Sequence, residues 1–252
     1  MSLKFLNVYR DLMEHGNVIR PRGQEVKELE DYQIILDPYE RFTNFEARHM
    51  SFNYLAAEWA WYLGADPFDT MISDKAQMWR DIQQPDGSFF SNYGQYWFGP
   101  QQGVRWVVEE LTRDPDSRRA VIPMLNKDHL FAKNKDVVCT EAINFRIRNG
   151  ALNMTVNMRS NDAVWGMTND IACFSFLQEL VAGILEVPMG RYCHKADSLH
   201  VYARHYKMLE NILDQGEDGY TEIDCPKMDG DDLAYQYMRK RKLGPFCKWL
   251  FQ

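Results

Sequence analysis

The feature that most constrains the fold is a β-hairpin signal followed by a long apolar segment. Asn149-Gly150 separates two runs, 142–148 and 152–158, in which apolar and polar residues alternate. Alternation predicts half-buried strands, and Asn-Gly favours the tight turn that joins antiparallel strands. Residues 169–185 are strongly apolar over a helical length, so they predict a buried helix. A hairpin and a helix able to cover it predict an α+β fold.

Other segments extend this prediction to a mixed or mainly antiparallel sheet packed with long helices. Apolar periodicity predicts helices over 3–15, 52–63, 70–82 and 103–112, and a further helix after residue 202 that ends near 213. Strands are expected over 25–36, 120–125, 139–148 and 198–202. The segment 84–99 carries turn signals and is predicted to be a loop, and Asn169 or Thr168 is expected to cap the buried helix. The acidic region after Gly216 predicts no clear element. With no linker in the sequence, we expect one domain, 1–252.

Composition narrows the classes of function. Hydrophobic residues make up 45% and aromatic residues 13% of the 252 residues, which predicts a folded chain throughout. The net charge of −7 argues against a general nucleic-acid binder, whose surface should be basic. A local arginine cluster in an acidic protein still allows small anionic substrates.

Cysteine, histidine and N-terminal patterns bear on compartment and metals. Five widely spaced cysteines without a CxxC motif argue against a disulfide framework and favour a reducing compartment. The six histidines form no HxH or HExxH pattern, so no metal site is expected. Residues 1–10 lack a signal-peptide core, and no apolar run approaches membrane-spanning length. We therefore expect a cytoplasmic protein without a membrane partner.

Two side chains could take part in catalysis. Cys139 lies between a polar loop, 133–136, and a β-patterned run. Neighbouring Lys and Arg residues can lower the pKa of a thiol and make it a nucleophile; the alternative is a buried small hydrophobe. Glu58 lies in an otherwise apolar helical segment, where burial can raise the pKa of a carboxyl group and suit it to proton transfer. The alternative for Glu58 is a side chain that points outward.

Several polar segments could bind an anion or a sugar. Arg118-Arg119 follows a turn, and Arg20 and Arg22 lie in another cation-rich loop; guanidinium pairs suit phosphate or carboxylate, although solvated surface pairs are the alternative. The segment 159–162 ends a strand before a helix and could cradle an anion or form a simple joint. His200 and Tyr202 would face one side of a strand. They could hold a sugar hydroxyl or pack as a core pair.

In this order the segments resemble the thymidylate synthase family, and the likeness runs from about Arg22 to about His205. Asp114-Pro-Asp-Ser-Arg-Arg119 is similar to the family's paired-arginine phosphate motif, and Cys139 falls where its nucleophile falls. The resemblance also includes four further motifs: Arg159-Ser-Asn-Asp162 with Gly166, Asp197-Ser-Leu-His-Val-Tyr202, Glu58 with Trp61, and Asn92-Tyr-Gly94. It implies a thymidylate synthase-like fold with the sheet at a dimer interface.

The resemblance also implies a chemistry and a set of roles. The Cys139 thiolate would add to C6 of a pyrimidine, so that C5 attacks the one-carbon unit of 5,10-methylenetetrahydrofolate. Glu58 and Tyr93 would belong to the catalytic group, with Glu58 assisting proton transfer through water. The implied nucleotide-binding residues are Arg22, Arg118, Arg119, Arg159, Ser160, Asn161, His200 and Tyr202, and the implied folate contacts are Trp79 and Asp162. The paired arginines would come from the partner subunit, so the resemblance implies an obligate homodimer.

Departures from the family pattern indicate which base the nucleotide substrate carries. Asp170 stands where thymidylate synthases carry Asn. A carboxamide can donate and accept, as uracil requires, whereas an ionised carboxylate only accepts and suits the N4 amino group of cytosine. An ordinary helix-capping Asp is the alternative. With Val156–Asp162 and Trp165-Gly166, Asp170 resembles the deoxycytidylate hydroxymethylases of T-even-like phages. In those enzymes water traps the exocyclic methylene and tetrahydrofolate leaves. Thr140, Val138 and the ending Lys248–Gln252 also differ from synthases and are consistent with water access.

Three rival functions remain open at this stage. A CMP 5-hydroxymethylase of nucleoside biosynthesis would share the site, although Ser160 favours the deoxy substrate. A dUMP-using synthase or hydroxymethylase would need a different partner for the base at Asp170. An inactive homologue that binds nucleotide or RNA would not need Cys139, Glu58 and the arginine set together.

Overall fold

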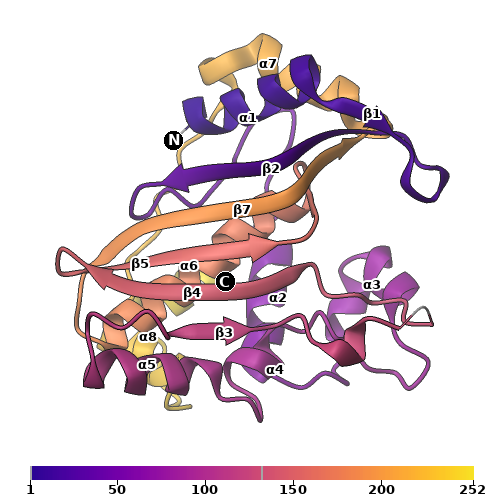
Figure 1. Ribbon diagram of the computed structural model, residues 1–252. Coiled ribbons are helices and arrows are strands. Elements are labelled where there is room, and N and C mark those ends of the chain that lie inside the picture. Colours follow the sequence, from indigo (N-terminus) through magenta and orange to yellow (C-terminus); the bar gives the residue numbers. More distant parts are fainter. Residues whose placement is uncertain (1, 132) are drawn as a thin grey trace.

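A mixed sheet of seven strands organises residues 2–131 and 133–252, which the computed structural model describes. The sheet runs from one edge to the other as β1 (Asn17–Ile19), β2 (Val26–Leu36), β7 (Met189–Tyr202), β5 (Ala151–Met158), β4 (Thr140–Arg148) and β3 (Val121–Pro123) (Figure 1). The short β6 (Asn161–Asp162) also pairs with β7. Strand β7 runs parallel to β5 and β6, and the other pairs are antiparallel. The predicted α+β class with a mixed sheet is confirmed.

The hairpin predicted at Asn149-Gly150 joins β4 to β5. Both turn residues have positive φ, 53° and 72°, as a type I′ turn requires. Along β5 burial alternates with the strand period, and the side chains that point into the core are Leu152, Met154, Val156 and Met158. The intervening side chains point to the opposite face, where Arg146 Nη2 on β4 donates to Thr155 Oγ1 at 2.8 Å.

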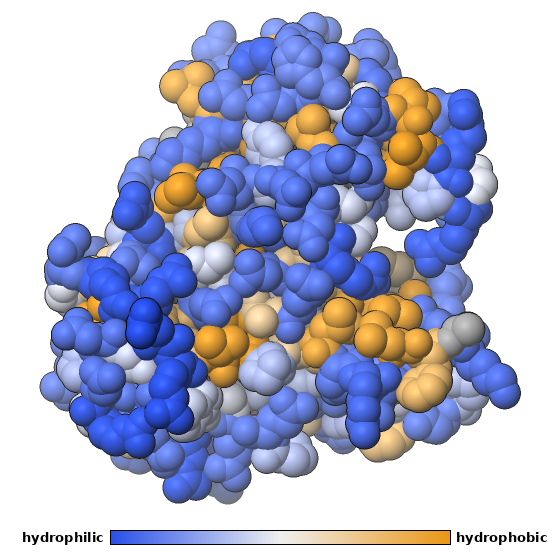
Figure 2. Space-filling view, viewed as in Figure 1, coloured by the Kyte–Doolittle hydropathy of each residue, from blue (hydrophilic) through white to orange (hydrophobic). Residues whose placement is uncertain are grey.

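Helices cover one face of the sheet. The long α6 (Gly166–Ile184) packs against β5 and β7, and α2 (Phe52–Gly64) packs against α6. Strands β4, β5 and β7 lie in front of these two helices in Figure 1. Near one edge of the sheet α1 (Ser2–His15) contacts β2 and α7 (Tyr206–Gln215), and near the other α5 (Gly103–Arg113) contacts β3 and β4. The side of the molecule facing the viewer is mostly hydrophilic, with scattered hydrophobic patches (Figure 2).

Several predicted boundaries were wrong. Helix α6 begins at Gly166 with Trp165 as its N-cap, so Thr168 lies inside it and bonds back to Val164 O at 3.0 Å instead of capping it. The predicted helix 70–82 divides into a 3-10 turn, Met71–Asp74, and α3 (Gln77–Ile82), because Ala76 between them is extended. The predicted loop 84–99 contains α4 (Gly94–Trp97). Short 3-10 turns also span Pro21–Gly23, Lys127–His129 and Ala203–His205.

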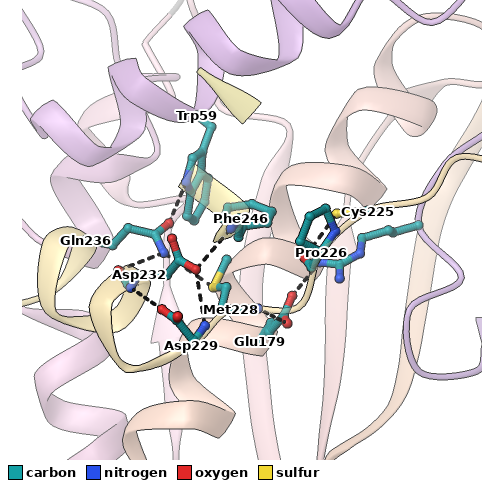
Figure 3. A network of polar contacts seen from close by, with 10 residues as sticks. Trp59, Glu179, Cys225, Pro226, Met228, Asp229, Asp232, Gln236 and Phe246 are labelled. Carbon is teal, nitrogen blue, oxygen red and sulfur yellow. Dashed lines mark hydrogen bonds and ion pairs between the residues drawn. The ribbon is translucent and has the colours of Figure 1, made fainter. Parts of the chain in front are cut away.

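The region after Gly216, for which the sequence predicted no element, is anchored by buried polar groups (Figure 3). It contains a 3-10 turn (Gly216–Gly219), α8 (Gly230–Gln236) and α9 (Pro245–Leu250). Asp232 of α8 is fully buried, and its carboxylate accepts from the backbone N–H groups of Phe246 and Cys247 at 3.1 and 2.9 Å. Gln236 accepts from Trp59 Nε1 of α2 at 2.8 Å. These bonds fix the C-terminal segment to the helices behind the sheet.

Candidate active site

The hairpin places Cys139 beside Arg159. Cys139 precedes β4 and Arg159 follows β5, so the free ends of the two strands meet, and the backbone N–H of Arg159 donates to Cys139 O at 2.9 Å. The Arg159 guanidinium donates from Nη2 to Val137 O at 2.6 Å and from Nε to Val138 O at 3.0 Å. The same Nη2 lies 3.5 Å from Cys139 Sγ. Two carbonyl groups therefore hold a cation next to the thiol.

The pKa of the Cys139 thiol is nevertheless raised from its ordinary value. Burial is the largest cause, and the charges of Asp170 and Asp136 add to it, while Arg159 and Arg22 oppose the rise. The expectation of a lowered thiol pKa is thus wrong for the single chain, because loss of hydration outweighs the two cations. Further positive charge brought to the site would favour the thiolate.

Asp170 lies in the interior of α6, five residues beyond its N-cap, so the ordinary capping role is excluded. Its Oδ2 accepts from Asn161 Nδ2 at 2.8 Å. Burial raises the pKa of Asp170 to about 7; the charge of Asp162 adds to the rise and the Asn161 bond opposes it. A Cβ at Gly166 would stand 3.0 Å from Asn161 Nδ2, so the glycine leaves room for this pair.

Glu58 points inward from α2 and is buried, which excludes the outward alternative. Its Oε1 accepts from the Tyr54 hydroxyl at 3.0 Å, and its Oε2 lies 3.7 Å from the Cys173 thiol. Trp79 Nε1 in turn donates to Tyr54 at 2.9 Å. Burial raises the pKa of Glu58 to about 8, with a further contribution from the charge of Asp170. At neutral pH the group mainly carries a proton that it can exchange.

Aromatic side chains form the surroundings of these groups. Tyr93 is buried just before α4, and its ring stacks on Tyr62 and on Phe174. Burial raises its pKa well above the ordinary value, and the charges of Asp170 and Cys139 contribute. Trp79 is buried with only 5% of its surface exposed and packs edge-on against Trp61. An apolar wall of this kind strengthens every charge interaction inside it.

The nucleotide-binding and folate-binding candidates on β6 and β7 lie side by side. Asp162 pairs in register with His200, and its Oδ1 accepts from the backbone of Val164 at 3.0 Å. The rings of His200 and Tyr202 are 5.2 Å apart on the same side of β7. Ser160, directly after Arg159, is half-buried. One end of the sheet therefore gathers the polar residues from 159 to 162 and from 200 to 202.

The paired arginines lie elsewhere in the chain. Arg118 and Arg119 are exposed in the loop between α5 and β3. Ala120 O accepts from Phe145 N at 2.8 Å, so this loop lies beside the far half of β4. Cys139 is six residues back along that strand, or about 20 Å at roughly 3.3 Å per residue. Arg22 is exposed on a 3-10 turn, with a positive φ of 52°.

Sequence reasoning missed three side chains that contact the candidate residues, Tyr54, Cys173 and His194, and a fourth, Tyr192, that contacts His194. The first two hydrogen-bond Glu58, and His194 hydrogen-bonds Asn161. Tyr54 could have been found, because it lies one helical turn before Glu58. His194 lay outside the predicted strand.

Within residues 2–131 and 133–252, no three His, Cys, Asp or Glu side chains group in a way that could hold a metal ion. Over the same residues, no helix has the length and apolar character needed to cross a membrane.

Comparison with known proteins identifies relatives. The sequence model described as Thymidylate synthase matches residues 3–239. A deoxyuridylate hydroxymethyltransferase of Bacillus phage SP01 is 31% identical over 82% of this chain and 59% of its own length. Deoxycytidylate 5-hydroxymethyltransferases of Enterobacteria phages T4 and T2 are 29% and 30% identical, over 68% and 65% of this chain and 75% and 72% of theirs. The chain thus spans less than two thirds of the phage SP01 protein, and its relatives act on two different bases.

Proposed function

This chain belongs to the thymidylate synthase family, and from that premise we propose that it hydroxymethylates dCMP at C5. The reaction would consume methylenetetrahydrofolate and water and release 5-hydroxymethyl-dCMP and tetrahydrofolate. The relatives are phage proteins, which supports a reaction in the cytoplasm of the host cell.

The observation that carries the choice of base is the carboxyl group of Asp170. Asn161 engages one of its oxygens at 2.8 Å, and we assign the other to the base. An ionised carboxylate accepts hydrogen bonds only, and cytosine offers the N4 amino group as a donor at this edge. Uracil would present O4, a second acceptor, and one acceptor would remain unpaired. A site built on such bonds discriminates strongly between substrates.

Residues of this chain would carry the covalent step. The Cys139 sulfur adds to C6 of the pyrimidine, while Arg159, 3.5 Å from it, favours the thiolate. Addition makes C5 a carbon nucleophile. Methylenetetrahydrofolate supplies the one-carbon unit that C5 attacks. Glu58, whose pKa is raised to about 8, exchanges protons through water near C5, and Tyr93 completes the catalytic group.

Residues of two subunits would bind the nucleotide phosphate together. Arg22, Arg159 and Ser160 of one chain bind the phosphate, together with Arg118 and Arg119 of its partner. The separation of about 20 Å along β4 between the paired arginines and Cys139 supports donation across an interface. Positive charge from the partner would also oppose the burial that raises the thiol pKa. We therefore propose an obligate homodimer with the sheet at the interface.

We assign the sugar and folate contacts to residues of β6 and β7 and to Trp79 of α3. His200 and Tyr202, on one side of β7, would hold the 3′-hydroxyl. Asp162 is half-buried and offers a carboxylate acceptor for N–H donors of the pterin ring. Trp79 would contact the folate from the aromatic wall. A carboxylate acceptor and an aromatic side chain are the kinds of group that a flat ring with polar edges requires.

A second candidate is hydroxymethylation of dUMP. One relative is a deoxyuridylate hydroxymethyltransferase. Burial raises the pKa of Asp170 to about 7, so a protonated carboxyl group, which can donate to O4, is also populated near neutral pH. CMP is a third substrate that the same contacts would accept.

Mass spectrometry of the products tests the proposal. The chain is incubated with methylenetetrahydrofolate and dCMP, CMP or dUMP in separate reactions. We expect dCMP to gain one CH2O unit without the rise in absorbance that marks dihydrofolate. Faster conversion of dUMP or CMP, or a methylated product, would contradict the assignment. Cys139→Ala should abolish tritium release from C5-labelled dCMP.

A further inference from the structure

A series of buried hydrogen bonds, here called the relay, leads from Tyr192 on β7 through His194 and Asn161 to Asp170. The Tyr192 hydroxyl lies 2.8 Å from His194 Nδ1, and His194 Nε2 lies 2.9 Å from Asn161 Oδ1. Asn161 Nδ2 then donates to Asp170 Oδ2 at 2.8 Å. Tyr192, His194 and Asn161 are each at most 5% exposed. Three side chains from two strands therefore form a series that ends on Asp170, the residue to which we assign the choice of base.

The donor and acceptor groups of these side chains fix the direction of the hydrogen bonds in the relay. Burial lowers the pKa of His194 to about 3, so its ring is neutral and carries one N–H. The Asn161 carbonyl oxygen can only accept, so Nε2 of the histidine is the donor and Nδ1 accepts from the Tyr192 hydroxyl. The amide nitrogen of Asn161 is then left to face Asp170. Each partner thus sets the orientation of the next.

We propose that Tyr192 and His194 are positioning residues that hold the Asn161 amide with its N–H toward Asp170, and so keep Asp170 an ionised acceptor for an amino-bearing pyrimidine. Only the effect on substrate choice rests on the proposed function; the effect on Asp170 does not.

The opposite orientation of the Asn161 amide shows why its orientation matters for Asp170. If the Asn161 amide turned over, its oxygen would face the Asp170 carboxylate, and two acceptors would meet. That arrangement becomes favourable when Asp170 is protonated and donates to the amide oxygen. The histidine would then have to carry its proton on Nδ1. The direction of the relay is therefore coupled to the charge of Asp170, and the charge-assisted bond favours the ionised form.

Besides His194, which acts through Asn161, seven acids interact electrostatically with Asp170 among the residues that the structure describes. They come from α2, from the segments before α4 and β4, from β6, from α6 and from β7: Glu58, Tyr62, Tyr93, Cys139, Asp162, Cys173 and Tyr192. Any negative charge on them disfavours ionisation of Asp170. The Asn161 bond opposes burial and the charge of Asp162, so the relay bears directly on how this carboxyl group titrates.

The direct test is the titration of the Asp170 carboxyl carbon by ¹³C NMR, with the signal assigned by its loss in Asp170→Asn. In His194→Phe and in Asn161→Leu the midpoint should rise by roughly one pH unit, because the carboxylate loses an oriented donor. His194→Gln retains an N–H donor and should shift it less. The matched control is His129→Phe, since His129 is also buried and lies 3.1 Å from a tyrosine hydroxyl, that of Tyr96.

Kinetics then connect the titration to substrate choice. In His194→Phe the ratio of kcat/KM for dCMP to that for dUMP should fall about tenfold, and the acidic limb of the dCMP profile should move to higher pH. His129→Phe should change neither. If wild-type chain does not convert dCMP, the proposed function fails while the NMR titration still decides the relay. An Asp170 midpoint that stays the same in His194→Phe, or one that moves equally in His129→Phe, overturns the relay.

Discussion

Replacing Asp170 by Asn should change the preferred base, and the surrounding hydrogen bonds determine how. Asn161 Nδ2 lies 2.8 Å from Asp170 Oδ2 and would still donate after the substitution. The oxygen of the new amide must therefore face Asn161, and its NH2 group must face the base. For dCMP two N–H groups would then meet, whereas for dUMP a donor would meet O4.

The size of the effect follows from the two bonds that change. An unmade hydrogen bond in a buried site costs about 1–3 kcal/mol. Asp170→Asn removes one such bond for cytosine and adds one for uracil. The difference in activation free energy between the two substrates should therefore shift by about 3 kcal/mol. That corresponds to a change of roughly 100-fold in the ratio of kcat/KM for dCMP to that for dUMP.

The assay is steady-state turnover of both nucleotides by wild type, Asp170→Asn and a control, Asp74→Asn, with products identified by mass spectrometry. Asp74 is exposed and paired with Arg80, so its substitution should leave the ratio unchanged. A ratio in Asp170→Asn within twofold of wild type would refute the base assignment. Equal loss of both activities would indicate that Asp170 serves only to support the site.

Three other predictions test neighbouring parts of the structure. The pKa of Glu58 is raised to about 8 in the folded chain, so its contribution to stability is present below about pH 4.5 and is lost as pH rises to 8. Urea unfolding should therefore show that the free energy of unfolding of Glu58→Gln increases by about 3 kcal/mol relative to that of the wild type between pH 5 and 8. Parallel pH curves for the two proteins would contradict this. Gly166→Ala places a Cβ 3.0 Å from Asn161 Nδ2, so kcat/KM for dCMP should fall about tenfold while the urea midpoint changes little. Mixing inactive Cys139→Ala with inactive Arg119→Ala should restore activity in hybrid dimers, whereas no recovery after confirmed subunit exchange would argue against arginine donation by the partner.

Local signals predicted those parts of the fold that local chemistry determines. The turn at Asn149-Gly150 needs two residues with positive φ and was predicted from that dipeptide, with both flanking strands. Once the hairpin is known, the meeting of Cys139 with Arg159 follows, because residues before one strand and after its partner lie together. The start of α6 was missed because Trp165, a residue without a capping side chain, begins it.

Long-range pairing determined what the sequence did not reveal. Strand β7 continues from Met189 to Tyr202 because it pairs with β2 on one side and with β5 and β6 on the other. Its first half carries His194 and Lys195, which break the apolar pattern of a strand, so only 198–202 was predicted. The C-terminal helices likewise depend on Asp232, whose carboxylate satisfies N–H groups 14 and 15 residues away. Such partners have no signature in the local sequence.

Burial is the main cause of the raised pKa of both carboxyl groups of the site, Asp170 and Glu58, and hydrogen-bond donors around each oppose it. Asp170 accepts from a carboxamide that a histidine and a tyrosine hold in place, and that bond opposes the effect of burial on its pKa. Glu58 accepts from the Tyr54 hydroxyl and lies near the Cys173 thiol; burial, with a contribution from the charge of Asp170, raises its pKa to about 8 against these bonds. When Asp170 ionises near neutral pH, its charge therefore helps Glu58 to keep a proton. In the proposed reaction Asp170 would then accept from the base, and Glu58 would hold the proton that the chemistry at C5 requires.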